Sequence, residues 1–111
     1  MPRSAAMSVS SVRIATQDPS RLIRRLCKHW AHKYPVSFDE RQGEIQLALG
    51  HCLLQAGDGL LDVRLQASDA GQASFFRQVV AEHLQRMAGG ETLDFAWRDD
   101  EAGIASGEGK D

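Results

Sequence analysis

The chain lacks the long apolar runs and the cysteine spacings that mark several large classes of protein. No stretch approaches the ~20 apolar residues of a membrane-spanning helix, and Met1 to Ser8 lack the apolar core of a secretory signal. Only two cysteines occur, so the sequence does not indicate a disulfide framework. These absences predict a cytoplasmic protein whose two thiols are structural.

The composition that is present is that of one ordinary globular domain. The 111 residues are 42% hydrophobic and 25% charged, and a chain of this length suits a single core. We expect a flexible N-terminus over residues 1–9, one domain over residues 10–98, and a disordered tail over residues 99–111. The tail is predicted because it is rich in acids and glycine and nearly devoid of apolar residues.

The strongest pattern predicts one amphipathic helix over residues 18–34. At 100° per residue its apolar side chains fall within one arc, and its cations fall on the opposite side. Asp18 suits the N-cap, Pro19 suits the first helical position, and Pro35 stops the helix. The apolar arc contains Leu22, Ile23, Leu26, Cys27, Trp30 and Tyr34.

Alternation of apolar and polar residues predicts six strands around two helices. The strands are expected over residues 10–16, 36–38, 44–49, 51–56, 61–66 and 93–98. A second helix is expected from Ser68 or Asp69 to about Met87 or Ala88, ended by the glycines that follow. This β-α-β-β-β-β-α-β order predicts an α+β two-layer sandwich, with both helices on one face of an antiparallel sheet.

The opposite face of that sheet is predicted to be mostly polar. Its expected residues are Arg13, Glu44, Gln46, Gln55, Asp62, Arg64, Gln66, Asp94 and Arg98. Leu53 and Leu60 also fall on this face, where they mark either a dimer surface or ordinary scattered exposure. The sequence leaves the oligomeric state open.

The charge is distributed unevenly along the chain. Residues 1–38 carry seven Lys or Arg and one acid, whereas residues 39–111 carry six Lys or Arg and fourteen acids. The excess of basic residues is therefore concentrated around the first helix. This asymmetry indicates either an anionic partner at that helix or pairing of the helix with the acidic remainder of the fold.

The basic, histidine-bearing side of the first helix is the candidate binding surface. Its residues are Arg21, Arg25, Lys28, His29, His32 and Lys33. This surface predicts a small binding or accessory module for an anionic small molecule or a protein partner. Nucleic acid is not favoured as the partner, because the sequence pI is near 6.1 and no exposed aromatics are evident for base stacking. The sequence indicates no cofactor.

The alternative is a metal-handling or acid–base catalytic domain that uses His29, His32 and His83. His29 and His32 are three residues apart, so they are weak candidates for sharing a metal ion, but a site needs three or four converging ligands. His83 falls within the apolar arc of the second helix. If the helices pack side by side, His29 and His83 approach one groove, where a neutral imidazole can act as a general base. Whether the protein is an enzyme stays open.

Several short motifs together resemble a known bacterial family. The most specific is the Leu-Cys-Lys-His-Trp-Ala-His-Lys run at residues 26–33. Further matching motifs follow in order at residues 18–19, 38–40, 50–52 and 79–84.

Over about residues 10–98 the chain thus resembles the family known only as domain of unknown function 2218. The family has no assigned activity, so the resemblance implies little about function. Similar domains occur beside or joined to siderophore-interacting flavin reductases, which implies a link to iron handling.

Overall fold

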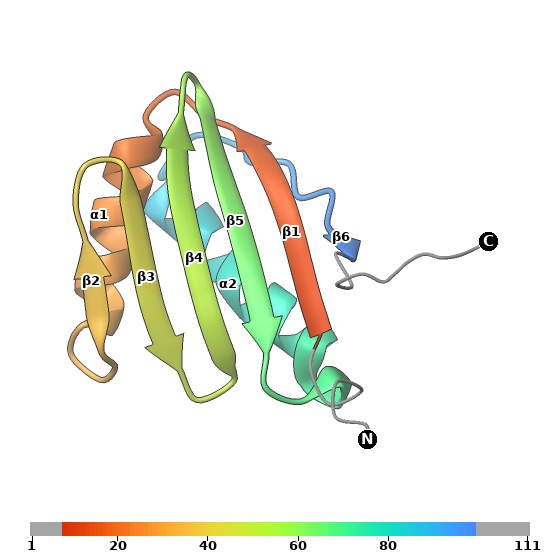
Figure 1. Cartoon of the computed structure of the whole chain (residues 1–111). Helices are drawn as coiled ribbons and strands as arrows, with labels where there is room; N and C mark the ends of the chain where they lie inside the picture. The colour runs from red at the N-terminus through yellow and green to blue at the C-terminus, as the bar shows by residue number, and fades with distance from the viewer. Residues whose placement is uncertain (1–7, 100–111) are drawn as a thin grey trace.

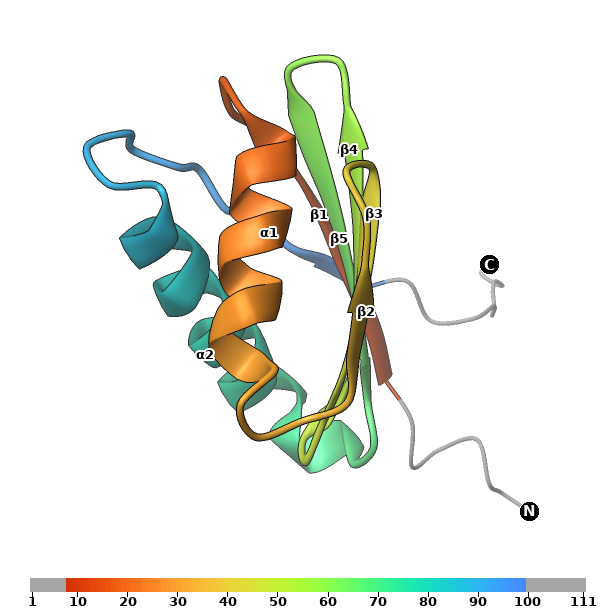
Figure 2. The ribbon, with the colours of Figure 1, turned by 90° about the vertical axis from the view of Figure 1, so that its left-hand side faces the viewer.

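A computed structural model describes residues 8–99 and shows two layers, one sheet and one pair of helices (Figure 1). The six strands are antiparallel in the order β2-β3-β4-β5-β1-β6. Both helices lie on the same face of the sheet, which Figure 2 shows edge-on. The predicted fold class is confirmed, whereas the expectations for residues 1–7 and 100–111 fall outside the described part of the chain.

The elements agree closely with the sequence pattern except near their ends. The strands are β1 (Ser8–Ala15), β2 (Val36–Phe38), β3 (Gln42–Leu47), β4 (Gly50–Gly57), β5 (Leu60–Ala67) and β6 (Arg98–Asp99). The helices are α1 (Pro19–Trp30) and α2 (Ala73–Met87), with a short 3-10 helix, η2 (Ala70–Gln72), before α2. Between residues 8 and 99 no helix is long and apolar enough to cross a membrane.

Helix α1 begins as predicted but ends four residues early. The Asp18 carboxylate accepts a hydrogen bond from the Arg21 backbone N–H at 3.1 Å, and Pro19 opens the helix. The helix ends at Trp30 and a turn covers the residues before Pro35. A residue that precedes proline is disfavoured in the helical conformation, which excludes Tyr34 from the helix.

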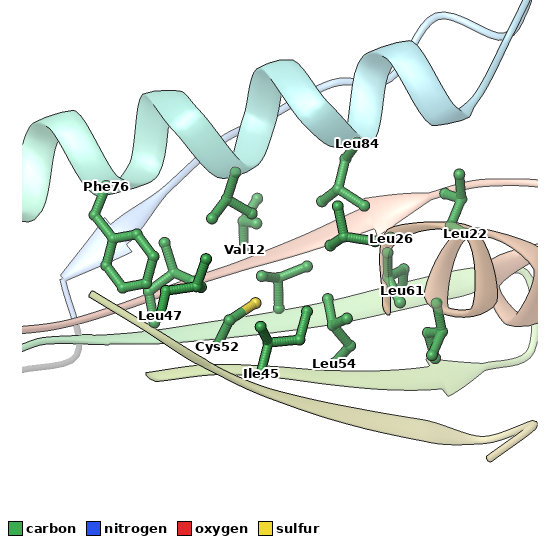
Figure 3. Packing of buried hydrophobic residues seen from close by; sticks show 14 of the residues in the cluster. Val12, Leu22, Leu26, Ile45, Leu47, Cys52, Leu54, Leu61, Phe76 and Leu84 are labelled. Carbon is green, nitrogen blue, oxygen red and sulfur yellow. The ribbon is translucent and has the colours of Figure 1, made fainter. Parts of the chain in front are cut away.

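The core lies between the sheet and the two helices. Along the strands the buried residues alternate with exposed ones, as at Val12 and Ile14 of β1 and at Ile45 and Leu47 of β3. Figure 3 shows the helix side chains meeting those of the sheet from above. The residues labelled there belong to both layers. The helices contribute Leu22, Leu26, Phe76 and Leu84, and the strands contribute Val12, Ile45, Leu47, Cys52, Leu54 and Leu61.

The predicted last strand over residues 93–98 is wrong in extent. Only Arg98 and Asp99 pair with β1, and the preceding residues run without strand partners. Leu93 is nevertheless buried, and its backbone N–H donates to the Gln85 side-chain oxygen at 2.9 Å. Alternation of apolar and polar residues shows only which side chains face the core. An extended segment can have this pattern without pairing with a neighbouring strand. Asp94, which was expected on the sheet, is exposed in this segment instead.

Hydrogen bonds from Arg77 connect the short strand β6 to β1 and α2. Arg77 of α2 donates from Nη1 to the Ser10 hydroxyl at 2.9 Å and to the Asp99 carboxylate at 3.0 Å. Ser10 is one of the few buried polar residues, so this contact also satisfies its hydroxyl group. Strand β6 is therefore held by a side chain as well as by its two backbone pairings.

Candidate functional site

The two histidines singled out by the sequence meet where the helices pack side by side. Helices α1 and α2 run antiparallel (Figure 2), and the ring centroids of His29 and His83 are 5.2 Å apart. Trp30 lies beneath them, with its ring centroid 4.8 Å from that of His83. We call this place the helix seam, made of Arg25, His29, Trp30, His83 and Arg86. The expected approach of His29 and His83 is confirmed.

His83 has one ring nitrogen fixed by the backbone of its own helix. Its Nδ1 lies 2.7 Å from the Val79 carbonyl oxygen, one turn earlier. Because a carbonyl oxygen only accepts, Nδ1 carries the hydrogen, which leaves Nε2 as the acceptor of a neutral ring. The ring is half-buried above Trp30, which is 6% exposed. The hydrogen bond to Val79 therefore fixes the orientation of the His83 ring, and Nε2 is the nitrogen that can bind a ligand or accept a proton.

His29 is exposed, and its surroundings lower its pKa. Burial of part of the ring is the largest cause that lowers its pKa from the ordinary value, and nearby positive groups lower it further. In decreasing order of effect these groups are His83, His32, Arg86 and Lys33. The neutral ring is therefore favoured, and an anion placed among these groups would favour the protonated ring instead.

The remaining cations of the predicted surface have different surroundings. Arg25 donates from Nη1 to the Met87 carbonyl oxygen at 2.8 Å, which ties α1 to the end of α2. Within residues 8–99, Lys28 and Lys33 form no hydrogen bond or ion pair through their side chains and are exposed. Pairing with acids of the described fold therefore does not account for these two lysines.

The structure does not bring every predicted residue to one place. Arg21 lies eight residues before His29 on α1, which separates the two by about 12 Å along the helix axis. His32 and Lys33 follow the end of α1 and lie in the turn after Trp30. Both still act on His29 through their charge. Of the predicted surface, the seam thus contains Arg25 and His29 and has His32 and Lys33 close enough to act on His29, whereas Arg21 lies outside it.

Sequence reasoning missed Arg86, which adds a cation from the second helix. Arg86 is exposed and contributes to the lowered pKa of His29. The available signal was its spacing, since residues three apart on a helix share a face and Arg86 follows His83 by three. A site divided between two helices is difficult to recognise until their packing is known.

The metal alternative lacks further ligands in the described part of the chain. Across residues 8–99 no group of three or more His, Cys, Asp or Glu side chains could hold a metal ion. Cys27 and Cys52 are both fully buried free thiols. Burial raises the pKa of Cys27 to about 11 and also raises that of Cys52. Since metals bind the thiolate, neither cysteine is prepared to join the histidines.

Comparison with known proteins supplies a family but no activity. Residues 11–98 match a family described as "Uncharacterized protein conserved in bacteria (DUF2218)". The NMR structure of PA4090 from Pseudomonas aeruginosa is similar, with 38% sequence identity and a TM-score of 0.64. The similarity covers 84% of this chain and 95% of that one. No curated protein matches the chain. This chain therefore belongs to the bacterial family DUF2218, as its motifs suggested.

Proposed function

We propose that this protein is a small binding module that captures an anionic small molecule at the helix seam. The observation that carries the proposal is the meeting of His29 and His83, with ring centroids 5.2 Å apart, among cations contributed by two helices. Lys33, which acts on His29 through its charge, forms no ion pair with the described acids and adds to this positive charge. A phosphate or carboxylate group suits such a set, because charge-assisted hydrogen bonds to anionic oxygens are the stronger ones.

The electrostatics of His29 make the proposed binding depend on protons. In the free protein the surrounding positive groups disfavour the imidazolium form. A bound anion would offset them and raise the pKa of His29 toward or above its ordinary value. Binding would then take up a proton, and affinity would fall as the pH rises through the pKa of His29 in the complex. Because the cations are exposed, affinity should also fall with added salt.

The test is an NMR titration of the full chain with inorganic phosphate and with citrate. We expect the ring signals of His29 and His83 to move together, and a Lys33→Gln, Arg86→Gln variant to bind about tenfold more weakly. The matched control for each of these two substitutions made singly is Arg41→Gln. It removes one exposed cation from the β2–β3 turn, which contacts the N-terminal end of α1 through the Ser20 hydroxyl and the Glu40 carbonyl oxygen.

Two results of the small-anion titrations would contradict this function. One is saturation of phosphate or citrate binding without a shift of either histidine ring. The other is an equal loss of affinity in the Arg41→Gln control, which would mean that the anions respond only to overall charge. Capture of an acidic protein without binding of either small anion would also replace the proposal with a protein-docking function.

A second candidate is proton transfer or metal handling by the same histidines. It is favoured by the fixed Nδ1–H of His83, which presents Nε2 as an acceptor near a His29 ring that is favoured in its neutral form. Protein purified without an affinity tag separates the candidates by metal analysis. Stoichiometric iron or zinc, lost in a His29→Asn, His83→Asn variant, would support the second candidate over the first.

A further inference from the structure

We propose that the outer edge of strand β2 is a docking site for an extended, acidic segment of a partner protein, which would pair with β2 as an added strand. Within residues 8–99, β2 is the last strand of the sheet and has a neighbour on one side only. Figure 1 shows it at the left edge of the sheet, with α1 behind it. Strand addition at such an edge is a common mode of peptide recognition.

The hydrogen bonds between β2 and β3 show which backbone groups of β2 face outward. The Pro35 carbonyl oxygen accepts a bond from β3 at 3.1 Å, and the Asp39 N–H donates one to β3 at 2.9 Å. In an antiparallel pair every second residue bonds to the neighbouring strand, so Ser37 also bonds to β3. Val36 and Phe38 therefore point their N–H and C=O groups outward. Within the described chain no backbone or side-chain group bonds to these four outward groups.

The side chains of Val36 and Phe38 add an apolar surface beside those backbone groups. Their direct partners on β3 are Ile45 and Gly43, which are buried on the helix side of the sheet. Direct partners project on the same face, so Val36 and Phe38 also point to the helix side. Phe38 is still 39% exposed, and Val36 is only partly buried. An apolar side chain of an added strand would cover the exposed part of Phe38.

The flank of α1 next to this edge supplies positive charge. The Ser20 hydroxyl donates to the Glu40 carbonyl oxygen, just after β2, and so holds this flank of the helix beside the strand. Arg24 and Lys28 follow Ser20 at intervals of four residues, so they lie on the same side of α1. Both are exposed, and neither side chain has a hydrogen bond or ion pair within residues 8–99. Carboxylates on a docked segment would find these two cations without a competing acid.

The same charge argues against a second copy of this chain as the occupant. Antiparallel pairing of β2 with β2 of another copy would put both α1 helices on one side of the joined sheet. Arg24 and Lys28 of each copy would then face those of the other across the two-fold axis, and like charges repel. An acidic segment brings the opposite charge to the same flank. We therefore assign the edge to an acidic partner.

A designed peptide tests the edge in the full chain. The probe is acetyl-Thr-Glu-Thr-Val-Thr-Glu-Thr-amide, whose alternation puts Glu, Val and Glu on one side of a strand. Added antiparallel, like the other strands of this sheet, it would bond to Val36 and Phe38 through its Glu and Val residues. We expect amide hydrogen exchange at Val36 and Phe38 to slow at least about tenfold with bound peptide. Exchange at Ser37, which already bonds to β3, should change little.

Control peptides separate backbone pairing from charge. N-methylation of the Glu and Val residues removes the N–H groups that would bond to β2 but keeps every side chain. This peptide should bind at least about tenfold more weakly than the probe. N-methylation of the three central Thr–Thr intervals is avoided; methylation of the Thr residues alone is the matched control, and it should weaken binding much less. Replacement of both Glu by Lys should also weaken binding at least about tenfold.

Protein variants distinguish this edge from the helix seam. Arg24→Gln with Lys28→Gln should weaken the probe about tenfold. The seam variant Lys33→Gln, Arg86→Gln also removes two exposed cations and should leave peptide binding unchanged. An unchanged amide spectrum over the rest of the sheet would show that the Arg24, Lys28 variant is folded.

Four results would overturn the docking site. They are unchanged exchange at Val36 and Phe38 with the probe, equal binding of the Lys peptide, equal loss in both protein variants, and protection of the two amides that grows with protein concentration alone. The last result would show that a second copy occupies the edge. Phosphate and citrate binding at the helix seam is measured separately, so none of these results bears on it.

Discussion

The Arg25 guanidinium of α1 donates a hydrogen bond to the Met87 carbonyl oxygen, the last residue of α2, at 2.8 Å. The final carbonyl groups of a helix have no partner within the helix, and a cation is favoured beside them. Arg25 therefore stabilises the packing of the two helices whether or not it also binds a ligand. A variant that reverses the charge of Arg25 would therefore lose the contact between the helices as well as any bound ligand, and the two effects could not be separated.

Replacing Arg25 with Gln should lower the free energy of unfolding by about 1 kcal/mol, because it removes a charge-assisted hydrogen bond on a partly solvated surface. Urea denaturation measures the change. The matched control is Arg24→Gln, which removes an exposed neighbouring cation that has no such bond within residues 8–99. That control should stay within about 0.5 kcal/mol of the parent. Equal losses in both variants would argue that helix charge, not the contact with Met87, matters.

The lowered pKa of His29 should make the fold less stable in mild acid. Between the folded pKa and the ordinary value of 6.5, the unfolded chain binds more protons at this ring, so stability falls as the pH drops below about 6.5. A His29→Gln variant should therefore lose less stability than the parent between about pH 7.5 and about pH 5.5. Urea midpoints at the two pH values provide the comparison. An equal loss of stability in both proteins would mean that the fold does not lower the pKa of His29.

Neither cysteine should react with iodoacetamide in the folded protein. Cys27 and Cys52 are fully buried, and burial raises the pKa of both thiols, so the thiolate form is scarce and inaccessible. Mass spectrometry should find no labelling under native conditions at about pH 8 and two labels after unfolding in urea. Rapid labelling of Cys27 in the folded state would show that α1 opens away from the sheet.

The Gly50→Ala variant should be strongly destabilised. Gly50 begins β4 with φ +149°, and an added Cβ would collide with the backbone carbonyl oxygen of Gln66. We expect a loss of about 2–3 kcal/mol in unfolding free energy, from the backbone strain and the clash. The control is Gly90→Ala, where an added Cβ meets nothing within 4 Å. A mild effect at both positions would mean that the strand pairing at Gly50 shifts easily.

Where the predicted last strand failed, the cause was a tertiary contact. Residues 93–97 alternate like a strand, yet their burial is provided by the core and the Gln85 amide, not by a neighbouring strand. The basic helix was predicted to continue to Tyr34, but it ends at Trp30, and Pro35 excludes Tyr34 from it. The approach of His29 and His83 was predicted correctly from helix faces alone, although Arg86 was not.

The sequence by itself determined the elements, their inner faces and the family, because apolar periodicity and turn residues act over a few neighbouring positions. The tertiary structure alone decided which strands are neighbours, and hence that Arg98, Ser11, Arg64, Leu53 and Glu44 form one row across the sheet. Glu44, Leu53 and Arg64 lie on three consecutive strands, whereas Ser11 and Arg98 come from the two ends of the domain. Only the pairing of β1 with β5 and with β6 brings Ser11 and Arg98 into line with the other three, and no local pattern encodes it.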